Sequence, residues 1–527
     1  MADNRIELRQ ALDEEQNAFA AMQQQHFKVR AKMALENEAL RNSFRGASDF
    51  LMAKRRAVFP DETALSGLRD RGEAIRQYSL SKLPQLLETL EKNLTANGIQ
   101  VHWAETAAEA CQIIHGILDS NNAKTVVKGK SMVTEEIELN HYLQEKGIEC
   151  LESDMGEYLV QLAGETPSHI IMPAIHKNKE QVAKLMHGRA QTSDGKGVPY
   201  TEDVDQMIGN ARAILRDKFM HADAGISGVN MAVANSGTLC LVENEGNGRM
   251  TTTVPELHIA VTGIEKVVED FSHVPELLTL LTRSATGQKI STYFNMISGP
   301  RKAGEMDGPE QVHLVLVDNG RSRIFNHPLL KPTLQCIRCG ACMNHCPVYA
   351  RIGGHAYGST YPGPIGQVVM PQIGGLEKYG AMLTACSLNG ACGEACPVRI
   401  PLPDLIRDLR AEANSPQSED ATGFRGGSVR SGFQPVNGRG SGRTAGESLI
   451  WKSWSLAHRM PVIYRLMTWG LTRCRRLFHT RGAEKILSPW TSSRSAPVPA
   501  ARSLHERVRA AGIASAVHNN PHDGGQS

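Results

Sequence analysis

The pattern of hydrophobic and polar positions divides the chain into a helical start, a long series of strands and helices, and a polar end. Residues 1–80 are rich in Gln, Glu, Ala and Leu with few helix breakers, which predicts helices. These helices either brace the next domain or form a solvated arm. An amphipathic segment then ends at Asn97-Gly98, a pair typical of helix C-termini.

From residue 82 onward, short β-type runs alternate with helical patterns. Thr106 is a good N-cap for a helix over 107–119, Ser131 opens another helix, and a third is predicted over 177–187. The β-type runs lie at 99–104, 124–129, 147–153, 168–174, 229–244, 257–263 and 311–320. Because strands that alternate with helices form parallel βαβ units, we expect one α/β domain over 81–325, with the later runs extending one sheet.

The sequence changes character again beyond the cysteine-rich part of the chain. Residues 415–446 are rich in Gly, Ser, Arg and Pro, which predicts a flexible linker. A C-terminal region over 447–527 follows, in which a short helical segment to about residue 490 carries tryptophans and the remainder looks weakly ordered. From Ala421 to Ser527 there are 16 Lys or Arg against 4 Asp or Glu, whereas the whole chain has a net charge of only +3. The tail is therefore a separate, strongly basic segment.

Composition excludes a wholly disordered chain and gives no sign of export. Hydrophobic residues make up 41% and charged residues 21% of the 527 positions, enough for at least one sizeable core. No apolar run reaches the roughly 18 residues of a transmembrane helix, and the polar N-terminus is not a secretory signal. We therefore expect a cytoplasmic protein, whose 11 cysteines are metal ligands rather than disulfides.

The first cysteine run, CIRCGACMNHCP, has the spacing of a bacterial ferredoxin. Its cysteines are Cys336, Cys339, Cys342 and Cys346, followed by Pro347. This C-x2-C-x2-C-x3-C-P pattern binds a cubane iron–sulfur cluster through its first three cysteines, whereas the fourth serves the other cluster of a two-cluster protein. The close spacing lets one loop reach three corners of the cube, and the proline turns the chain away.

The second run, CSLNGACGEACP, has Asn389 where the pattern requires its middle cysteine. The two-cluster rule gives two ligand sets, Cys336, Cys339, Cys342 and Cys396 for cluster 1, and Cys346, Cys386 and Cys392 for cluster 2. One corner of cluster 2 then has no thiolate. That iron is either lost, which gives a 3Fe–4S cluster, or kept in a 4Fe–4S cluster with water, hydroxide or Asn389 as a weak ligand. The preference of iron–sulfur clusters for thiolates slightly favours the three-iron form.

Other interpretations of the cysteines fit less well. A zinc site uses four ligands, fewer than the seven cysteines and two Cys-Pro endings present here. Cys111, Cys150 and Cys240 lack ligand spacing and are expected to be buried small apolar residues, and Cys474 has no assigned role. The Gly- and Pro-rich segment 353–366 either aims backbone N–H groups at a cluster or is an ordinary surface loop.

A second, weaker candidate site lies in the α/β region. Lys130 and Ser131 stand where a strand passes into a helix, whose free N–H groups attract anions. Arg249 follows a later strand, and ligands of α/β sheets favour strand C-terminal ends. A carboxylate or phosphate ligand is one interpretation of these three residues, and an ordinary strand–helix turn is the other. His176 and Glu157 are candidates of the same kind.

Several long segments resemble a known family. They are KSMVTEEIELNHYL (130–143), SDMGEYLVQL (153–162), HIIMPAIHK (169–177), NEGNGRMTTTVPELHIAV (244–261), GPRKAGEMDGPEQVHLVLVDNGRS (299–322), CIRCGACMNHCPVY (336–349) and GGHAYGSTYPGPIG (353–366). In these segments the chain resembles the iron–sulfur lactate utilization protein B family, which joins a LUD domain to a two-cluster ferredoxin domain. The resemblance spans about residues 60–410 and extends less clearly into the tail.

The resemblance implies an electron-carrying subunit of a three-protein complex that oxidises L-lactate to pyruvate. It implies an α/β fold of the CoA-transferase and ribose-phosphate isomerase type, followed over 326–414 by a mostly helical ferredoxin domain like that of succinate dehydrogenase iron–sulfur subunits. Family members usually hold two 4Fe–4S clusters, and Asn389 departs from that pattern. The resulting C-x5-C-x3-C-P resembles the three-iron motif of those succinate dehydrogenase subunits.

The expected partners are the other subunits of such a complex, with a quinone or the inner membrane surface as the place where electrons leave. The Trp- and Arg-bearing tail suits an anionic membrane surface, a partner groove or a solubilising extension. The main alternative function is a ligand-binding α/β enzyme that acts on an organic acid, with structural or redox-sensing clusters, and a redox-sensing scaffold is a third. Nucleic acid is not expected, because no recognition motif accompanies the basic charge.

Overall fold

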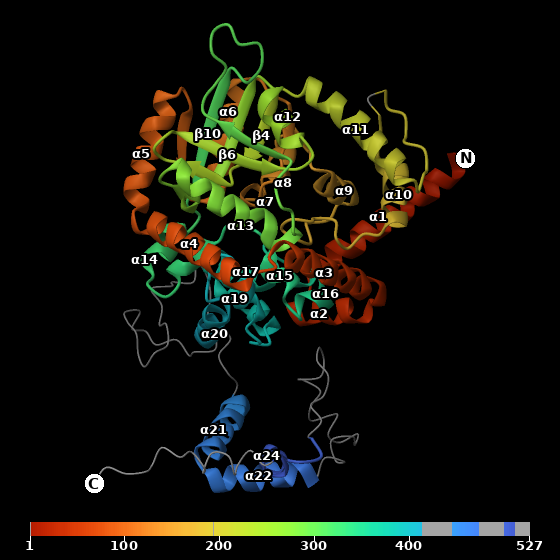
Figure 1. The fold of residues 1–527 in the computed structure, drawn as a ribbon. Coiled ribbons are helices and arrows are strands. Elements are labelled where there is room, and N and C mark those ends of the chain that lie inside the picture. Colours follow the sequence, from red (N-terminus) through yellow and green to blue (C-terminus); the bar gives the residue numbers. More distant parts are fainter. Residues whose placement is uncertain (1, 193, 414–444, 474–499, 512–527) are drawn as a thin grey trace. The chain divides into compact units, whose positions relative to one another are not determined.

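The computed structural model describes residues 2–192, 194–413, 445–473 and 500–511. Residues 1–440 form one compact unit and residues 441–527 a second. The first unit contains a parallel α/β sheet, a smaller sheet and a helical region that carries the cysteine runs (Figure 1). The predicted fold class, α/β with a parallel sheet followed by a mostly helical cysteine-bearing region, is confirmed.

The larger sheet has six parallel strands in the order β1-β10-β7-β4-β2-β3. Its strands are β1 (Gln100–Ala104), β2 (Thr125–Lys128), β3 (Glu149–Glu152), β4 (Ala224–Gly228), β7 (Leu257–Gly263) and β10 (Gln311–Val317). Every residue of β4 and β7 is buried, as expected for central parallel strands covered on both faces. This sheet accounts for five of the seven β-type runs in the sequence.

Helices connect and flank these strands. They are α5 (Leu83–Ala96), α6 (Ala107–Ser120), α7 (Met132–Glu136), α8 (Leu139–Glu145), α9 (Met155–Ala163), α10 (Lys179–Arg189), α11 (Val204–His221) and α12 (Asn247–Thr253). The two predicted N-caps are confirmed: Thr106 accepts the N–H of Glu109, and Ser131 accepts the N–H of Thr134.

One predicted strand belongs to a different sheet. The run at 229–244, expected to extend the larger sheet, instead forms an antiparallel hairpin of β5 (Met231–Val233) and β6 (Thr238–Glu243). The hairpin pairs with β8 (Val267–Val268) and β9 (Tyr293–Ile297) in a second sheet of order β8-β5-β6-β9. Its turn contains Gly237 at a φ of +59°, which favours glycine and reverses the chain where a long buried strand had been predicted.

The run at 168–174 forms no strand, so that prediction is wrong. Its N–H groups are satisfied locally, because Ser168 donates to Pro173 O, and Ile171 and Met172 both donate to His169 Nδ1. The run is apolar because the resulting loop faces the cysteine region, where Ile170 is 1% exposed. An apolar run of this length does not reveal whether a strand or a buried loop forms.

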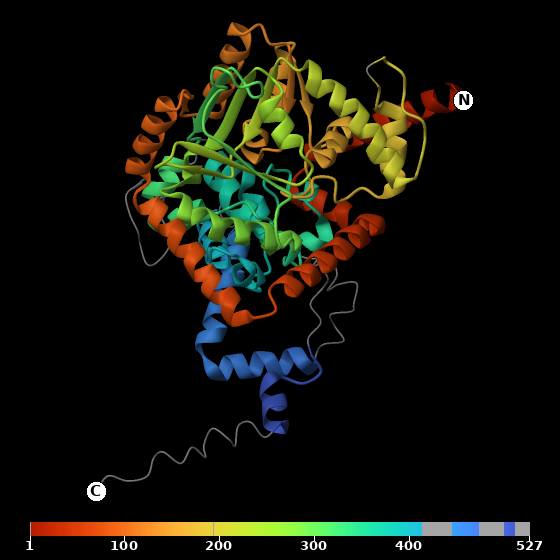
Figure 2. The ribbon, with the colours of Figure 1, turned by 45° about the horizontal axis from the view of Figure 1, so that its top comes forward.

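The N-terminal helices pack along the rest of the first unit. They are α1 (Ala2–Gln23), α2 (Phe27–Glu36), α3 (Glu38–Val58) and α4 (Glu62–Ser81). Helix α1 runs beside α10, as Figures 1 and 2 show. Arg9 of α1 donates a hydrogen bond to Gly188 O of α10 (2.7 Å). On α3, Phe44 packs edge-on against Tyr349 of the cysteine region, with ring centroids 5.4 Å apart. These helices therefore brace the unit, and the alternative of a solvated arm is wrong.

The cysteine region consists of short helices and 3-10 turns between longer helices. Its elements, with the helix and turns that lead into it, are η1 (Ile264–Lys266), η2 (Phe271–His273), α13 (Val274–Thr286), α14 (Arg321–Asn326), η3 (Lys331–Gln335), α15 (Ala341–Asn344), α16 (Tyr349–Ile352), η4 (His355–Tyr357), α17 (Gly363–Gly374), α18 (Leu376–Tyr379), η5 (Gly380–Ala385), α19 (Ala391–Ala395) and α20 (Leu402–Ala413). Tyr357 and Tyr361 are 1% and 0% exposed, so the segment 353–366 is not an ordinary surface loop.

The second unit is described through α21 (Ala445–Arg459), α22 (Pro461–Arg473) and α24 (Leu504–Ala510). The predicted linker over 415–446 lies outside the described residues except for the start of α21. Part of the end expected to be weakly ordered is α24, which has a capping box between Ser503 and Glu506. Within the described part of the chain, no helix is both long and apolar enough to cross a membrane.

Candidate metal centre

The four cysteines assigned to cluster 1 line one cavity. Cys336, Cys339, Cys342 and Cys396 all face the same small cavity. The remaining lining is largely apolar and includes Ile170, Ile337, Ile365, Val398 and Leu402. The two cysteine runs therefore meet as the two-cluster rule predicts, with the last cysteine of the second run beside the first three of the first run.

The chemistry of this donor set fits a cationic metal group. Burial, followed by the negative charge of Cys396 and Cys336, raises the pKa of Cys339 to about 12. Burial also raises the pKa of Cys396 to about 11, and burial and the neighbouring sulfurs raise that of Cys342 well above its usual range. Four crowded thiolates in an apolar cavity would be unstable by themselves, so this donor set suits a positively charged metal group.

Side chains of α3, α4 and η1 hold the loops around this cavity, and burial lowers the pKa of the η1 residue Lys266 to about 7. Arg55 and Arg69 donate to the carbonyl oxygens of Ala395 (3.3 Å) and Cys396 (3.0 Å) at the end of the second run. Lys266 donates to the carbonyl oxygen of Cys336 (2.8 Å) at the start of the first run. These contacts fix the cavity rim and place positive charge next to it, which favours the charge of thiolate ligands.

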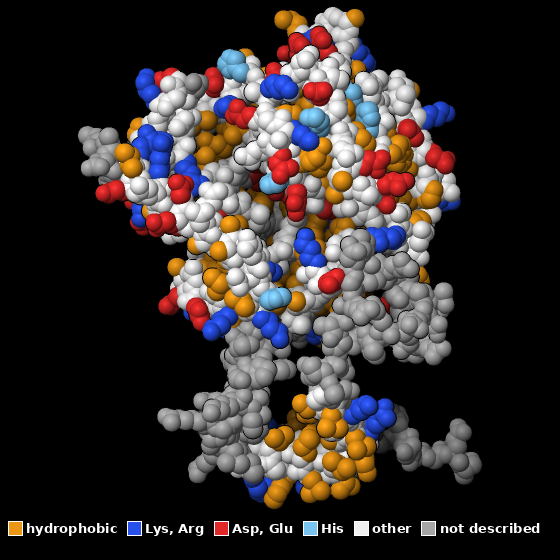
Figure 3. All heavy atoms as spheres, turned by 180° about the vertical axis from the view of Figure 1, so that it is seen from behind, with side chains coloured by type: hydrophobic (Ala, Val, Ile, Leu, Met, Phe, Trp, Pro, Cys, Tyr) orange, Lys and Arg blue, Asp and Glu red, His pale blue; other side chains and the backbone are white. Residues whose placement is uncertain are grey.

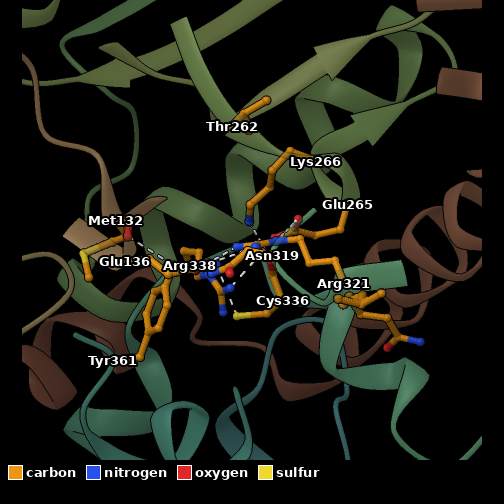
Figure 4. Close-up of polar contacts among 12 residues, drawn as sticks. Met132, Glu136, Thr262, Glu265, Lys266, Asn319, Arg321, Cys336, Arg338 and Tyr361 are labelled. Atoms are coloured by element: carbon orange, nitrogen blue, oxygen red, sulfur yellow. Dashed lines mark hydrogen bonds and ion pairs between the residues drawn. The ribbon is translucent and has the colours of Figure 1, made fainter. Parts of the chain in front are cut away.

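A buried ionic network joins the cluster 1 loop to the larger sheet (Figure 4). The guanidinium of Arg338 lies 4.4 Å from the ring centroid of Tyr361, whose hydroxyl donates to Glu136 Oε2 (2.8 Å). Arg321 bridges Glu136 (2.8 Å) and Glu265 (2.7 Å). Burial alone would raise the pKa of Glu265. Arg321, Lys266 and Arg338 outweigh that effect and lower this pKa to about 2, so the carboxylate stays charged.

The sheet contributes its carboxyl edge to this network. Glu136, Glu265 and Arg321 lie on α7, η1 and α14, the segments that follow β2, β7 and β10. Ligands of parallel α/β sheets usually bind at this edge. Here the loop of the first cysteine run covers part of it, so the candidate cluster site and the ligand-binding edge of the fold adjoin each other.

The three cysteines assigned to cluster 2 also lie together. Burial, followed by the charges of Cys346 and Cys386, raises the pKa of Cys392 to about 12. The hydroxyl of Tyr357 is buried beside Cys346, and burial together with the charge of Cys346 raises the pKa of Tyr357. A buried hydroxyl beside these sulfurs fits a site in which sulfur accepts its hydrogen bond.

The two cysteine runs have the same backbone conformation in spite of Asn389. Arg338 and Leu388 occupy equivalent positions with φ of +60° and +56°, and Gly340 and Gly390 follow with φ of +83° and +89°. The N–H of Arg338 points to Cys336 Sγ (3.4 Å), and that of Leu388 to Cys386 Sγ (3.2 Å). Two non-glycine residues in the left-handed region are unusual, so the repeat reflects one loop design used twice.

The weaker candidate residues all have internal partners. Lys130 Nζ donates to Ile171 O (2.6 Å), and Ser131 caps α7, which has only five residues. The guanidinium of Arg249 lies 4.8 Å from the ring centroid of Tyr293. The contacts of Lys130 and Ser131 are those of an ordinary turn between β2 and α7. The contact of Arg249 holds α12 against its neighbour Tyr293. An anion at Lys130, Ser131 and Arg249 stays a prediction.

The two remaining candidates of the α/β region are engaged in buried charge clusters. His176 Nε2 lies 2.6 Å from Glu165 Oε2. Glu157 is 2% exposed, and neither of its carboxylate oxygens has a partner in the described structure. Burial, followed by the charge of nearby Glu152, raises the pKa of Glu157 well above its usual range. Close by, Lys128 pairs with Glu152 (2.8 Å) at the carboxyl ends of β2 and β3.

The three described cysteines outside the runs, Cys111, Cys150 and Cys240, belong to the α/β domain. Cys111 and Cys240 are 2% and 0% exposed, as predicted, and burial raises the pKa of Cys240 to about 12. Cys150 is only partly buried and donates weakly to Asn140 Oδ1 (3.4 Å). Cys474 lies outside the described residues.

Sequence reasoning did not single out the charged residues that surround cluster 1, namely Arg55, Arg69, Arg76, Glu136, Glu265, Lys266, Arg321 and Arg338. Arg338 carried a usable signal, because it lies inside the first cysteine run. The other seven residues are not part of the cysteine runs. From sequence alone they cannot be distinguished from ordinary charged residues of helices and turns.

Comparisons with known proteins agree with this arrangement. A LUD domain model matches residues 87–317, a 4Fe-4S dicluster domain model matches 333–400, and a lactate utilisation protein B C-terminal model matches 408–513. The last match includes the Trp-bearing tail, where the resemblance was less clear from sequence. The dicluster match supports iron–sulfur clusters in the cysteine region.

Curated relatives cover most of the chain. Lactate utilization protein B of Bacillus velezensis is 40% identical over 478 residues, 90% of this chain and 94% of that protein. Lactate utilization protein B of Bacillus subtilis is 44% identical over 399 residues, covering 75% and 82%. The uncharacterized electron transport protein YkgF of Escherichia coli is 44% identical over 380 residues, covering 72% and 78%. The chain therefore belongs to the lactate utilization protein B family.

Proposed function

We propose that this chain is the iron–sulfur electron-transfer subunit of a complex that oxidises L-lactate to pyruvate. Lactate is oxidised on a partner subunit, and two clusters in this chain relay single electrons towards an acceptor. The observation that carries the proposal is the interleaving of the two cysteine runs. Cys396 of the second run lines the same cavity as Cys336, Cys339 and Cys342 of the first run, which supports ligand sets drawn from both runs.

The proposed ligands follow the two-cluster rule. Cluster 1 is a 4Fe–4S cluster held by Cys336, Cys339, Cys342 and Cys396. Cluster 2 is held by Cys346, Cys386 and Cys392, with three irons or with a fourth iron that has no cysteine. When bound, the clusters supply one-electron chemistry, and the chain positions them, excludes water with apolar side chains and sets their charge environment.

The residues around the clusters suit this role. Backbone N–H groups point at cysteine sulfurs, from Tyr349 to Cys346 (3.4 Å) and from Ile400 to Cys396 (3.3 Å). Such hydrogen bonds stabilise the reduced, more negative state of a cluster and therefore raise its reduction potential. The positive charges of Arg55 and Arg69 at the rim of cluster 1 act in the same direction.

The second candidate function is a ligand-binding enzyme that acts on an organic acid. The observation in its favour is the charge cluster at the carboxyl edge of the sheet, where Lys128 is fully buried and Glu157 has two unpaired oxygens. In that case the α/β domain performs the chemistry, and the clusters are structural or redox-sensing.

We further propose a membrane surface as the place where electrons leave the complex, with a quinone as acceptor. The helices of the second unit, α21 and α22, expose large apolar side chains, including Trp451, Trp454 and Trp469 at 47%, 50% and 54%. Figure 3 shows hydrophobic side chains gathered on this unit. With the excess of Lys and Arg beyond residue 421, such helices suit the interface of an anionic bilayer.

The relay is tested by removing cluster 1 in a strain that lacks the endogenous chain. Cys339→Ser removes a cluster 1 ligand, and Cys240→Ser, a buried cysteine outside both sets, is the matched control. Lactate-dependent dye reduction is measured in cell extracts, with iron content and electron paramagnetic resonance on the purified variants.

We expect Cys339→Ser to abolish lactate-dependent reduction while Cys240→Ser retains it. Retained turnover in Cys339→Ser, with cluster 1 shown to be lost, would overturn the relay and favour the ligand-binding enzyme. In that event the next variant is Glu157→Gln, because the rival function requires the charge cluster of the sheet edge.

A further inference from the structure

The strongest unexplained feature lies at the one position where the two cysteine loops differ in chemistry. Asn389 stands in the second loop where Cys339 stands in the first, and the backbone on either side is the same in both loops. Because the φ values of Leu388 and Gly390 repeat those of Arg338 and Gly340, the second loop retains the shape that presents a cluster ligand. Asn389 in place of a cysteine therefore changes the ligand atom that the loop offers, while the loop keeps the backbone shape that points this side chain at the cluster.

The surroundings of the two positions are opposite. Cys339 is 7% exposed and packs in a small apolar group with Ala285 and Ala341, beneath α13. Asn389 is exposed, and so is its neighbour Leu388 at 43%. Among the described residues of the first unit no element covers this corner, whereas α13 covers the equivalent corner of cluster 1.

Asn389 itself is poorly placed to act as a firm ligand. Its side chain is exposed to solvent, so water competes for the amide and no buried environment fixes it in a ligating orientation. An amide oxygen is also a hard donor, which binds cluster iron more weakly than thiolate does. The three remaining donors, Cys346, Cys386 and Cys392, are partly or fully buried, so they can retain the rest of the cluster.

We infer that the iron at the Asn389 corner of cluster 2 is exchangeable and takes its outer ligand from solvent. This inference rests on the proposed two-cluster relay and adds to it a solvent-facing iron site. Oxidation of a 4Fe–4S core of charge +2 by a one-electron oxidant releases Fe²⁺ and leaves a 3Fe–4S core of charge +1. Reduction of that core by one electron in the presence of Fe²⁺ reverses the step, so charge and iron balance in both directions.

The consequence for the relay is a switch. Cluster type is one of the determinants of reduction potential, so loss of the corner iron changes the potential of cluster 2 while cluster 1 is unaffected. Cluster 1 is protected because its equivalent corner has both a thiolate and the cover of α13. The relay then responds to oxidants and to the supply of ferrous iron through one residue.

The test uses the full-length holoprotein, purified without oxygen, and the variant Asn389→Cys as the matched control. Both are treated with ferricyanide, desalted, and then supplied with dithionite and ⁵⁷Fe²⁺. Iron and sulfide counts, electron paramagnetic resonance and Mössbauer spectra are recorded at each stage. Asn389→Ala is included to separate loss of the thiolate from any contribution of the amide.

For the natural sequence we expect about one iron of eight to leave on oxidation, with a signal of the oxidised three-iron cluster. About one ⁵⁷Fe per chain should then enter and remove that signal. Asn389→Ala should behave in the same way, and Asn389→Cys should keep its iron and show no such signal.

Two contrary results are distinguishable. Fresh protein with about eight irons that neither releases nor takes up iron would overturn the exchangeable corner and leave the relay intact. Fresh protein with only about four irons and no second cluster would overturn the two-cluster relay itself, and with it this inference.

Discussion

His169 and Asn344 form one of the buried hydrogen bonds between the α/β domain and the cysteine region, with His169 Nε2 3.1 Å from Asn344 Oδ1. The bond fixes the protonation of the ring, because Nδ1 already accepts the N–H groups of Ile171 (3.0 Å) and Met172 (3.2 Å). Asn344 in turn donates to Ala285 O (3.0 Å). The loop that sequence periodicity predicted as a strand is thus held to the helix between Cys342 and Cys346.

This arrangement predicts a specific loss of stability in mild acid. Burial, followed by the charge of Lys130, lowers the pKa of His169 to about 3, whereas an unfolded histidine titrates near 6.5. The unfolded chain therefore takes up the proton first, so the stabilising contribution of neutral His169 is present above pH ~6.5 and falls as the pH drops towards 3. Between pH 7 and 5 the loss from this group is about 2 kcal/mol.

The measurement is the pH dependence of thermal unfolding under anaerobic conditions, compared between the natural sequence and His169→Gln. The difference between the two proteins isolates this group from other buried histidines. His141→Gln, which changes an exposed side chain, serves as the control. If His169→Gln and the natural sequence lose stability in parallel from pH 7 to 5, the ring is not held neutral by these contacts.

Arg76 is predicted to be essential for the stability of the cluster 1 loop. It is 2% exposed, and its guanidinium donates to backbone oxygens of η1 and β8 on one side and of η3, including Gln335 O (3.3 Å) and Leu334 O (3.0 Å), on the other. Arg76→Met leaves these buried carbonyl groups unpaired, and we expect a loss of about 3 kcal/mol or more together with a reduced iron content.

The matched control lies on the same helix. Arg71 pairs with Glu276 (3.0 Å), but its side chain is 58% exposed, so Arg71→Met should cost less than about 1 kcal/mol. Denaturant unfolding and iron analysis of both variants separate the two cases. Equal effects of the two substitutions would show that the buried contacts of Arg76 carry no special weight.

The sequence predicted the elements of the α/β domain well because periodicity and caps are local. Thr106 and Ser131 each marked a helix start that the structure contains. What the sequence could not predict depends on contacts between distant segments. The hydrophobic pattern around Met231–Val233 does not show which of the two sheets the strand joins. The apolar run around Ile170 likewise does not show whether a strand or a buried loop forms.

The candidate site shows the same division. Ferredoxin spacing predicted that Cys396 would lie beside the first three cysteines of the first run, and these four residues line one cavity. The charges that surround them come from helices and strand ends far away in sequence, such as Arg76 and Glu265. The exposure of Asn389 against the cover of Cys339 is also a tertiary property, since the two loops have the same local pattern.

Arg338 is predicted to raise the reduction potential of cluster 1 through its fixed charge. It lies between Cys336 and Cys339 in sequence and is held against Tyr361, and its equivalent in the second loop is Leu388. Arg338→Leu therefore copies the second loop and removes one buried positive charge. We expect the potential of cluster 1 to become more negative, because a nearby cation favours the reduced state.

The measurement is a redox titration followed by electron paramagnetic resonance, and the reciprocal variant Leu388→Arg provides the comparison. Leu388→Arg should move only cluster 2, towards a more positive value and by a smaller amount, because its side chain is 43% exposed. A shift of both clusters in either variant would point to a general change in the fold instead of a local charge effect.

The last prediction concerns the helices of the second unit. Trp451, Trp454 and Trp469 are about half exposed, and Arg473 lies 4.4 Å from the ring centroid of Trp469. Replacing the three tryptophans by alanine removes apolar area worth about 1.5 kcal/mol or more per residue at a bilayer interface, roughly tenfold in affinity for each. We therefore expect the holoprotein to sediment with anionic vesicles, and the triple variant to bind at least a hundredfold more weakly.

Salt and lipid composition separate this interpretation from its alternatives. If the basic charge contributes, binding to vesicles with phosphatidylglycerol should weaken from low to high salt, and neutral phosphatidylcholine vesicles should bind less. Iron content must be the same in both proteins, so that the variant reports on the tail alone. Equal sedimentation of the natural sequence and the triple variant would rule out these helices as the membrane contact, and the exposed tryptophans would then be expected to bind a partner subunit.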